Sequence, residues 1–134
     1  MNLTQGGTVV LDCEGLSKLV ADDSRVIALV SRARDQRTHV ATSAITPVEA
    51  RHPGIAQPRF DWVLSRIDVV PVTEDISRSA SKLLAAARLH GHKYALDAIL
   101  CATALSLPGP VIVLTSDPED IATLCGPRVR VVKV

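Results

Sequence analysis

Val111-Ile112-Val113-Leu114 is an uninterrupted apolar run, and Thr8-Val9-Val10-Leu11 is a second one near the beginning of the chain. A strand that is apolar at every position is buried on both faces, which is typical of a parallel sheet covered by helices on both sides. Three further segments rich in β-branched residues lie at 39–42, 68–72 and 129–134. Helical patterns separate these five segments. The sequence therefore predicts an α/β fold with a mostly parallel five-stranded sheet.

The helical segments are recognised by their apolar spacing and by residues that begin or end helices. Apolar periodicity predicts helices around 16–20, 25–36, 59–65, 74–87 and 118–124. Residues 96–107 are apolar on nearly every side, which predicts a buried central helix. Thr46-Pro47-Val48-Glu49 is typical of a helix start in which Thr46 is the N-cap and Glu49 completes a capping box. We interpret Gly91 as the residue that stops the helix capped by Thr73.

Length and composition narrow the class of protein. The chain has 134 residues, and we expect a single domain over residues 1–134. Aromatic residues make up 2%, which argues against a protein that stacks nucleic-acid bases on several aromatic side chains. The net charge is +1, so no overall basic charge indicates nucleic-acid binding. Residues 1–7 show no leader signature, and no apolar stretch is long enough to span a membrane, so we expect a soluble, cytoplasmic protein. Cys13, Cys101 and Cys125 form no Cys-x-x-Cys pair and are expected to be small buried hydrophobic residues.

Four acidic residues fall at the carboxyl ends of the predicted strands, where open parallel sheets bind ligands. Asp12 directly follows the first strand, and Asp117 is the third residue after the apolar run at 111–114. Glu49 opens the helix after the second strand, and Asp97 begins the predicted central helix. If the first and fourth strands are neighbours, all four carboxylates meet at one edge of the sheet.

Four carboxylates in one cleft repel one another and would mostly not ionise together. A bound divalent cation removes this repulsion. A ligand set made only of oxygen atoms suits Mg²⁺ or Mn²⁺ and does not suit zinc. Such a site can activate water and hold a phosphodiester for in-line attack.

Each acid also has an ordinary structural interpretation. Asp12 can be a helix cap or a turn residue, and Glu49 is explained by its capping box. Asp97 can complement the dipole at a helix N-terminus, and Asp117 before Pro118 is a common turn and helix start. Only the shared position of the four acids favours a metal site.

Four segments resemble the PIN-domain family, and in particular the VapC-like toxin ribonucleases of type II toxin–antitoxin systems. They are Val9-Val10-Leu11-Asp12, Ser43-Ala44-Ile45-Thr46-Pro47-Val48-Glu49, Leu96-Asp97-Ala98-Ile99-Leu100-Cys101-Ala102-Thr103-Ala104-Leu105 and Val113-Leu114-Thr115-Ser116-Asp117. The similarity spans nearly the whole chain in length and element order. It implies a PIN-like three-layer sandwich with sheet order 3-2-1-4-5, in which strands one and four are neighbours. It also implies a magnesium-dependent endoribonuclease that forms a homodimer and is neutralised by a cognate antitoxin protein.

The resemblance also assigns the metal site position by position. The acids that match the family's metal-site positions are Asp12, Glu49, Asp97 and Asp117. They would hold Mg²⁺ or Mn²⁺ directly or through water, and an activated water would attack the phosphorus of RNA. Thr115 matches a hydroxyl that supports the site.

Two further acids depart from the family's pattern. Glu14 stands where relatives often carry a small hydroxyl residue, and Asp120 follows Asp117 by three residues. We interpret Glu14 as a helix-start acid and Asp120 as a surface position, and leave open whether either joins the site.

Basic residues provide candidate contacts to RNA phosphates. Arg51, His52 and Arg59 follow Glu49 and are the better candidates. A second group is typical of a solvated helix face: Arg25, Arg32, Arg34 and Arg37. The spacing of His90 and His92 fits no helical metal pair, and we interpret His90 as a cation at a helix C-terminus.

Two other functions remain open from the sequence. One is a PIN nuclease that acts outside toxin–antitoxin systems, which a neighbouring antitoxin gene would argue against. The other is a catalytically silent PIN fold that serves as a binding module, which an absence of metal binding would favour. A receiver-like phosphate-handling domain ranks lower, because it would need a second acid beside Asp12 and a lysine after a late strand.

Overall fold

A computed structural model describes residues 6–134, which build a parallel sheet of five strands in the order β3-β2-β1-β4-β5. The strands are β1 (Thr8–Leu11), β2 (His39–Ser43), β3 (Asp68–Val70), β4 (Val111–Thr115) and β5 (Arg130–Lys133). All neighbouring strands run parallel. The central strand β1 pairs with β2 and β4 in a register that sets Leu11 between Thr42 and Leu114. The predicted α/β class and the order implied by the family resemblance are both confirmed.

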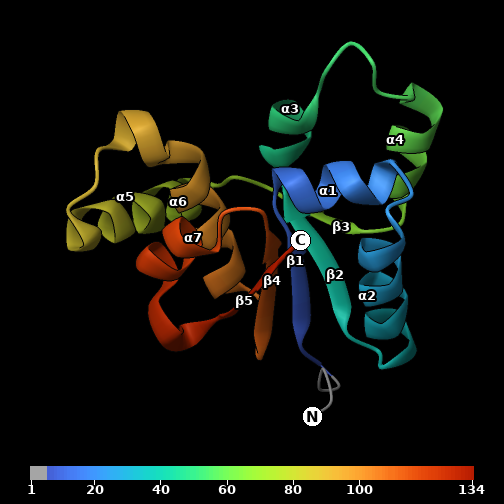
Figure 1. Ribbon diagram of the computed structural model, residues 1–134. Helices are drawn as coiled ribbons and strands as arrows, with labels where there is room; N and C mark the ends of the chain where they lie inside the picture. The colour runs from blue at the N-terminus through green and yellow to red at the C-terminus, as the bar shows by residue number, and fades with distance from the viewer. Residues whose placement is uncertain (1–5) are drawn as a thin grey trace.

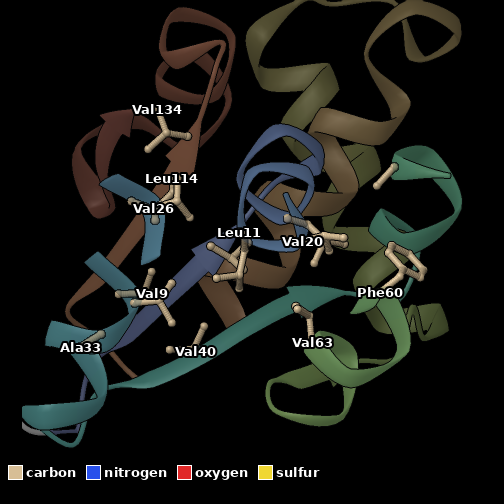
Figure 2. Close-up of a cluster of buried hydrophobic side chains, with 14 residues drawn as sticks. Val9, Leu11, Val20, Val26, Ala33, Val40, Phe60, Val63, Leu114 and Val134 are labelled. Atoms are coloured by element: carbon tan, nitrogen blue, oxygen red, sulfur yellow. The ribbon is translucent and has the colours of Figure 1, made fainter. Parts of the chain in front are cut away.

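Helices cover both faces of this sheet, as Figure 1 shows. They are α1 (Cys13–Val20), α2 (Ser24–Asp35), α3 (Thr46–Ala50), α4 (Gln57–Ser65), α5 (Glu74–Ala87), α6 (Gly91–Ser106) and α7 (Pro118–Cys125), and a short 3-10 turn follows at Gly126–Arg128. The helices α1 to α4 contribute to one core, part of which is drawn in Figure 2, and α5 to α7 contribute to the other. Strand β1 supplies Val9 and Leu11 to the first core and Val10 to the second, because successive side chains of a strand point to opposite faces. The three-layer sandwich is therefore confirmed.

The predicted capping box at α3 is wrong. Thr46 is 1% exposed and lies inside the helix, and the N-cap position belongs to Ile45, which makes no side-chain cap hydrogen bond. The turn that leads into α3 is instead held by the hydroxyl of Ser43, which accepts from the N–H of Ile45 at 3.3 Å. Burial of Thr46 thus outweighs its local capping preference. The capping-box explanation for Glu49 is removed with it.

The boundary between α5 and α6 also differs from the prediction. Helix α5 ends at Ala87, and Arg88 closes it in the left-handed conformation with φ 56°, the role that the sequence predicts for Gly91. Gly91 instead begins α6, with His90 at its N-cap position, so His90 does not sit in the last turn of a helix. Helix α6 therefore starts five residues earlier than predicted. Asp97 lies in its second turn and is not an N-terminal acid of the helix.

The predicted cap of α5 and the predicted burial of two of the three cysteines are confirmed. Thr73 caps α5, because its hydroxyl accepts from the N–H of Ile76 at 3.2 Å. Cys101 and Cys125 are buried free cysteines, and Cys13 is half-buried. Residues 1–5, which belong to the segment without a leader signature, lie outside the described residues. Among residues 6–134, no helix is both long and apolar enough to cross a membrane.

A close approach between α1 and β4 requires a glycine at position 15. A Cβ on Gly15 would lie 3.0 Å from the backbone carbonyl oxygen of Leu114 and 3.5 Å from the Leu11 side chain. The N–H of Gly15 also donates to the carboxylate of Asp12 at 2.8 Å. The first turn of α1 is thus pressed against the carboxyl end of β4, and this contact positions Asp12.

We expect Gly15→Ala to lower the free energy of unfolding by about 1–2 kcal/mol, because the new methyl group meets a backbone atom that cannot rotate away. Alanine normally stabilises a helix relative to glycine by about 0.5–1 kcal/mol, so the sign of the effect is diagnostic. Gly91→Ala is the matched control, since a Cβ there would meet only Leu84 at the ordinary distance of 3.7 Å. Urea unfolding measures both variants. Stabilisation by Gly15→Ala would contradict the close approach.

Candidate functional site

The carboxyl ends of β1 and β4 lie side by side and carry two of the predicted acids. Asp12 is the first residue after β1, and its N–H donates to the carbonyl of Leu114 in β4 at 3.1 Å. Asp117 follows the end of β4 by two residues, at the N-cap position of α7. The register partners Leu11 and Leu114 bring both chain reversals to the same edge of the sheet. In Figure 1 this edge lies opposite the N-terminus, at the end of the strands where α1 and α3 begin.

Asp12 is held by a set of hydrogen-bond donors. Its carboxylate caps α1 by accepting from the N–H of Gly15 at 2.8 Å. The N–H groups of Glu14 and Ser116 and the hydroxyl of Thr115 also bond to it. Burial raises the pKa of Asp12 above its usual value, and these hydrogen bonds oppose that rise. The cap interpretation of Asp12 is correct, and the same contacts fix the carboxylate beside β4.

Thr115 connects the two strand ends. Its side chain is fully buried, with 0% exposed. The hydroxyl bonds to the Asp12 carboxylate, and its oxygen accepts from the N–H of Asp117 at 2.9 Å. One buried hydroxyl thus interacts with residues of both the turn after β1 and the turn after β4.

Three acids form the tightest cluster of carboxylates in the described part of the chain. Asp97, Asp117 and Asp120 each offer one carboxylate oxygen that lies within 4.8 Å of the other two. Asp97 comes from α6, whereas Asp117 and Asp120 come from the start of α7. Asp120 is a partly exposed helix position, and the open question of its place is answered by its carboxylate, which lies beside the other two acids. The signal for it was the spacing of three residues from Asp117 across a helix start, which places two side chains on one side of the helix.

The pKa values of Asp97 and Glu49 reflect both their burial and the charges of neighbouring acids. Burial, followed by the charges of Asp120, Asp117 and Asp12, raises the pKa of Asp97 from 3.8 to about 6. Burial, followed by the charges of Asp97 and Asp12, raises the pKa of Glu49. Glu49, which α3 carries, therefore interacts electrostatically with Asp97 and Asp12. The cluster within 4.8 Å thus joins Asp97 and Asp117 to Asp120, and the charges of Asp12 and Glu49 act on the same group of acids.

The remaining predicted residues have different surroundings. Glu14 lies in the first turn of α1, as expected, and is not part of the three-acid cluster. Arg59 pairs with Asp22 at 2.6 Å, donates to the Leu19 carbonyl at 3.3 Å and ties α4 to the end of α1, so its guanidinium is already engaged. Arg51 donates to the side-chain oxygen of Gln57 on the exposed surface.

The donor set fits a hard divalent cation. The three-acid cluster consists only of carboxylates, and Asp12 and Glu49 add two further carboxylates that interact electrostatically with Asp97. Burial and then the repulsion among these charges raise the pKa values of Asp97 and Glu49, and a cation would relieve the repulsion. Oxygen donors of this kind suit Mg²⁺ or Mn²⁺. Such a cation can polarise a phosphoryl oxygen and activate water.

Comparison with solved structures identifies proteins of the same fold. The chain aligns with a chain of VapBC2 from Rickettsia felis bound to a promoter DNA fragment, with TM-score 0.71, 11% identity, and coverage of 95% of this chain and 98% of that one. It aligns with a toxin–antitoxin complex from Klebsiella pneumoniae, with TM-score 0.66, 22% identity, and coverage of 90% and 94%. For FitAcB from Neisseria gonorrhoeae the TM-score is 0.61, the identity 21%, and the coverage 92% and 95%. No family model and no curated protein matches the sequence.

Proposed function

We propose that this chain is a divalent-metal-dependent endoribonuclease that acts as the toxin of a bacterial toxin–antitoxin pair. The observation that carries the proposal is the cluster of Asp97, Asp117 and Asp120 beside Asp12, at the ligand-binding edge of a parallel sheet. The likeness in fold to chains of toxin–antitoxin complexes supports this assignment.

The residues of the chain have distinct roles in this proposal. The acids that would hold Mg²⁺ or Mn²⁺ are Asp12, Glu49, Asp97, Asp117 and Asp120. When bound, the cation supplies an activated water and neutralises charge on the phosphoryl group. Thr115 interacts with both Asp12 and Asp117 and would hold the two acids near each other. The N–H of Gly15 orients Asp12. Arg51 and His52 are exposed after Glu49 and are the proposed contacts for RNA phosphates.

The proposed partners follow from the same assignment. We expect a cognate antitoxin protein, since the Klebsiella structure is a toxin–antitoxin complex. We also expect a homodimer in the cytoplasm. Val48, 69% exposed, and Leu96, 40% exposed, directly precede Glu49 and Asp97 in the chain. Apolar side chains exposed in this way are typical of interaction surfaces, and measurement of the molar mass in solution tests the dimer.

The function is tested by incubating the pure protein with a mixed pool of structured RNAs in Mg²⁺, Mn²⁺ or EDTA. We expect cleavage with either metal and none in EDTA. Cleavage that persists in EDTA would contradict a metal-dependent nuclease. If no RNA is cleaved and no metal binds, the chain is a silent binding module instead. Cleavage of DNA with RNA untouched would assign it to the nucleases that act outside toxin–antitoxin systems.

The place of Asp120 in the cluster leads to a separate prediction. Asp120→Asn removes one charge from the three-acid group, and we expect it to weaken Mn²⁺ binding by about tenfold. Glu119→Gln is the matched control, because Glu119 is exposed on the same helical turn and is not part of the group. The signal of free Mn²⁺ in electron paramagnetic resonance measures both. If both variants weaken Mn²⁺ binding equally, Asp120 contributes only general negative surface charge and is no ligand of the cation.

A further inference from the structure

A groove of about 670 Å³ lies away from the acidic edge, between α2 and the strands β4 and β5. Its lining includes residues at the amino ends of β1 and β4, so it lies toward the opposite end of the sheet from the acids. The side chains that shape it include Leu29, Arg32, Ile112, Arg128, Arg130 and Val132. Its volume is in the range of about 300–1,000 Å³ that is typical of ligand sites.

The groove exists because the helical layer does not reach the edge of the sheet. Register pairs Val9 with Ile112 and Ile112 with Arg130, so the three residues form one row across β1, β4 and β5. Val9, in the core beneath α2, is 2% exposed, whereas Ile112 is only partly buried and Arg130 is exposed. Strand β5 is an edge strand, and its Val132 is also only partly buried. Parallel sheets are normally covered on both faces, so this part of the sheet is left without its cover.

The charges around the groove have one sign. Arg32 comes from α2, Arg128 from the turn before β5, and Arg130 from β5 itself. No carboxylate is among the described residues that line the groove. Within residues 6–134, none of these three arginines forms an ion pair with an acidic side chain. An occupant with negative charge would therefore meet three guanidinium groups that lack carboxylate partners.

We propose that this groove docks a segment of a partner polypeptide that carries aliphatic side chains flanked by Asp or Glu. The floor of Leu29, Ile112 and Val132 would bury the aliphatic side chains, and the arginines would bind the acids. The strand from Val111 to Leu114 rises roughly 10 Å, which matches three or four residues of an extended chain. At the carboxyl end of β4, Val134 lies close to Leu114 in Figure 2.

The aliphatic floor favours a polypeptide over RNA. Single-stranded RNA is bound by aromatic side chains on which bases stack, and no aromatic residue is among the described residues that line the groove. A sugar–phosphate backbone would satisfy the arginines but would leave the apolar floor in contact with polar groups. A peptide and an oligonucleotide can therefore be told apart by direct competition for the groove.

The test selects peptides from a random 12-residue display library on the full-length protein and removes those that also bind an Arg32→Glu, Arg130→Glu double variant. We expect enrichment of peptides that combine Leu, Ile or Val with Asp or Glu. Each single variant, Arg32→Glu or Arg130→Glu, should weaken binding of the selected peptide by about tenfold. Failure to enrich such peptides, or binding that is unchanged in both single variants, would overturn the proposal.

Arg25→Glu is the matched control. Arg25 is exposed on the same helix as Arg32 and does not line the groove, so the variant should change peptide binding by less than about threefold. Thermal unfolding of each variant shows that a loss of binding does not reflect a loss of fold. A 12-nucleotide oligouridine is the competitor. If it displaces the peptide and its own binding depends on Arg32, the groove is a nucleic-acid site and the proposed occupant is wrong.

Discussion

An Asp97→Asn variant is expected to cleave RNA at least about a hundredfold more slowly than the wild type in Mg²⁺ while keeping its fold. Asp97 interacts electrostatically with three other acids. Beyond the effect of burial, the charges of Asp120, Asp117 and Asp12 all raise its pKa. Replacing it with the isosteric amide removes one negative ligand but preserves the packing of α6. The measurement is the initial rate of RNA cleavage under metal saturation, beside circular dichroism of both proteins.

The matched control for this variant is Asp68→Asn. Asp68 is exposed at the start of the edge strand β3 and is no member of the acidic cluster. The control should cleave at the wild-type rate. If Asp97→Asn also cleaves at that rate, Asp97 has no part in the reaction, and the proposed assignment of the site is wrong.

The second large effect is on stability in the absence of metal. In EDTA, Asp97→Asn is expected to be more stable than the wild type at neutral pH and to lose this advantage near pH 4. The pKa of Asp97 is raised from 3.8 to about 6, so the folded chain keeps a proton that the unfolded chain has already released. The wild-type free energy of unfolding therefore falls as the pH rises from about 4 to about 6, and the amide lacks this dependence.

The expected difference between the two proteins at neutral pH is about 1–3 kcal/mol. Urea unfolding in EDTA at several pH values measures it. Addition of Mn²⁺ should reverse the order, because the cation binds the folded wild type and stabilises it. A stability difference that is the same at every pH would show that Asp97 does not titrate within a cluster of acids.

The sequence was sufficient to locate Asp12 and Asp117, because each closely follows an apolar strand. A fully buried parallel strand must end at the edge where the chain turns back over the sheet, so the acid that follows it is placed at the ligand edge. The residues alone do not reveal that β1 and β4 are neighbours, because an apolar strand carries no mark of its partner. The family resemblance supplied that expectation, and the strand pairing confirms it.

The errors in the prediction lie where tertiary contacts decide the local structure. Thr46 has the side chain of an N-cap, but its burial moves the start of α3 and leaves Glu49 free to face the other acids. Gly91 is a typical helix stop, but Arg88 adopts the left-handed conformation first. The spacing of three residues places Asp120 beside Asp117, but its approach to Asp97 depends on the packing of α6 against α7.

The groove beside β5 could not be predicted for a similar reason. The apolar pattern of β4 indicates burial on both faces, yet the position of α2 over β1 leaves one face partly open beside β5. Only one of the two structural features of Arg32 could therefore be predicted from the sequence. It is exposed on a helix, as predicted, and it also lines a concave apolar surface.

The most direct test of the central claim is calorimetric titration of Mn²⁺ and of Mg²⁺ into the wild type and into an Asp97→Asn, Asp117→Asn double variant. The claim is that the acids at the strand ends act together as one cation site. We predict saturable binding to the wild type and a loss of at least about a hundredfold in affinity in the double variant. Binding of equal strength in both proteins, or no binding to the wild type at millimolar metal, would contradict it.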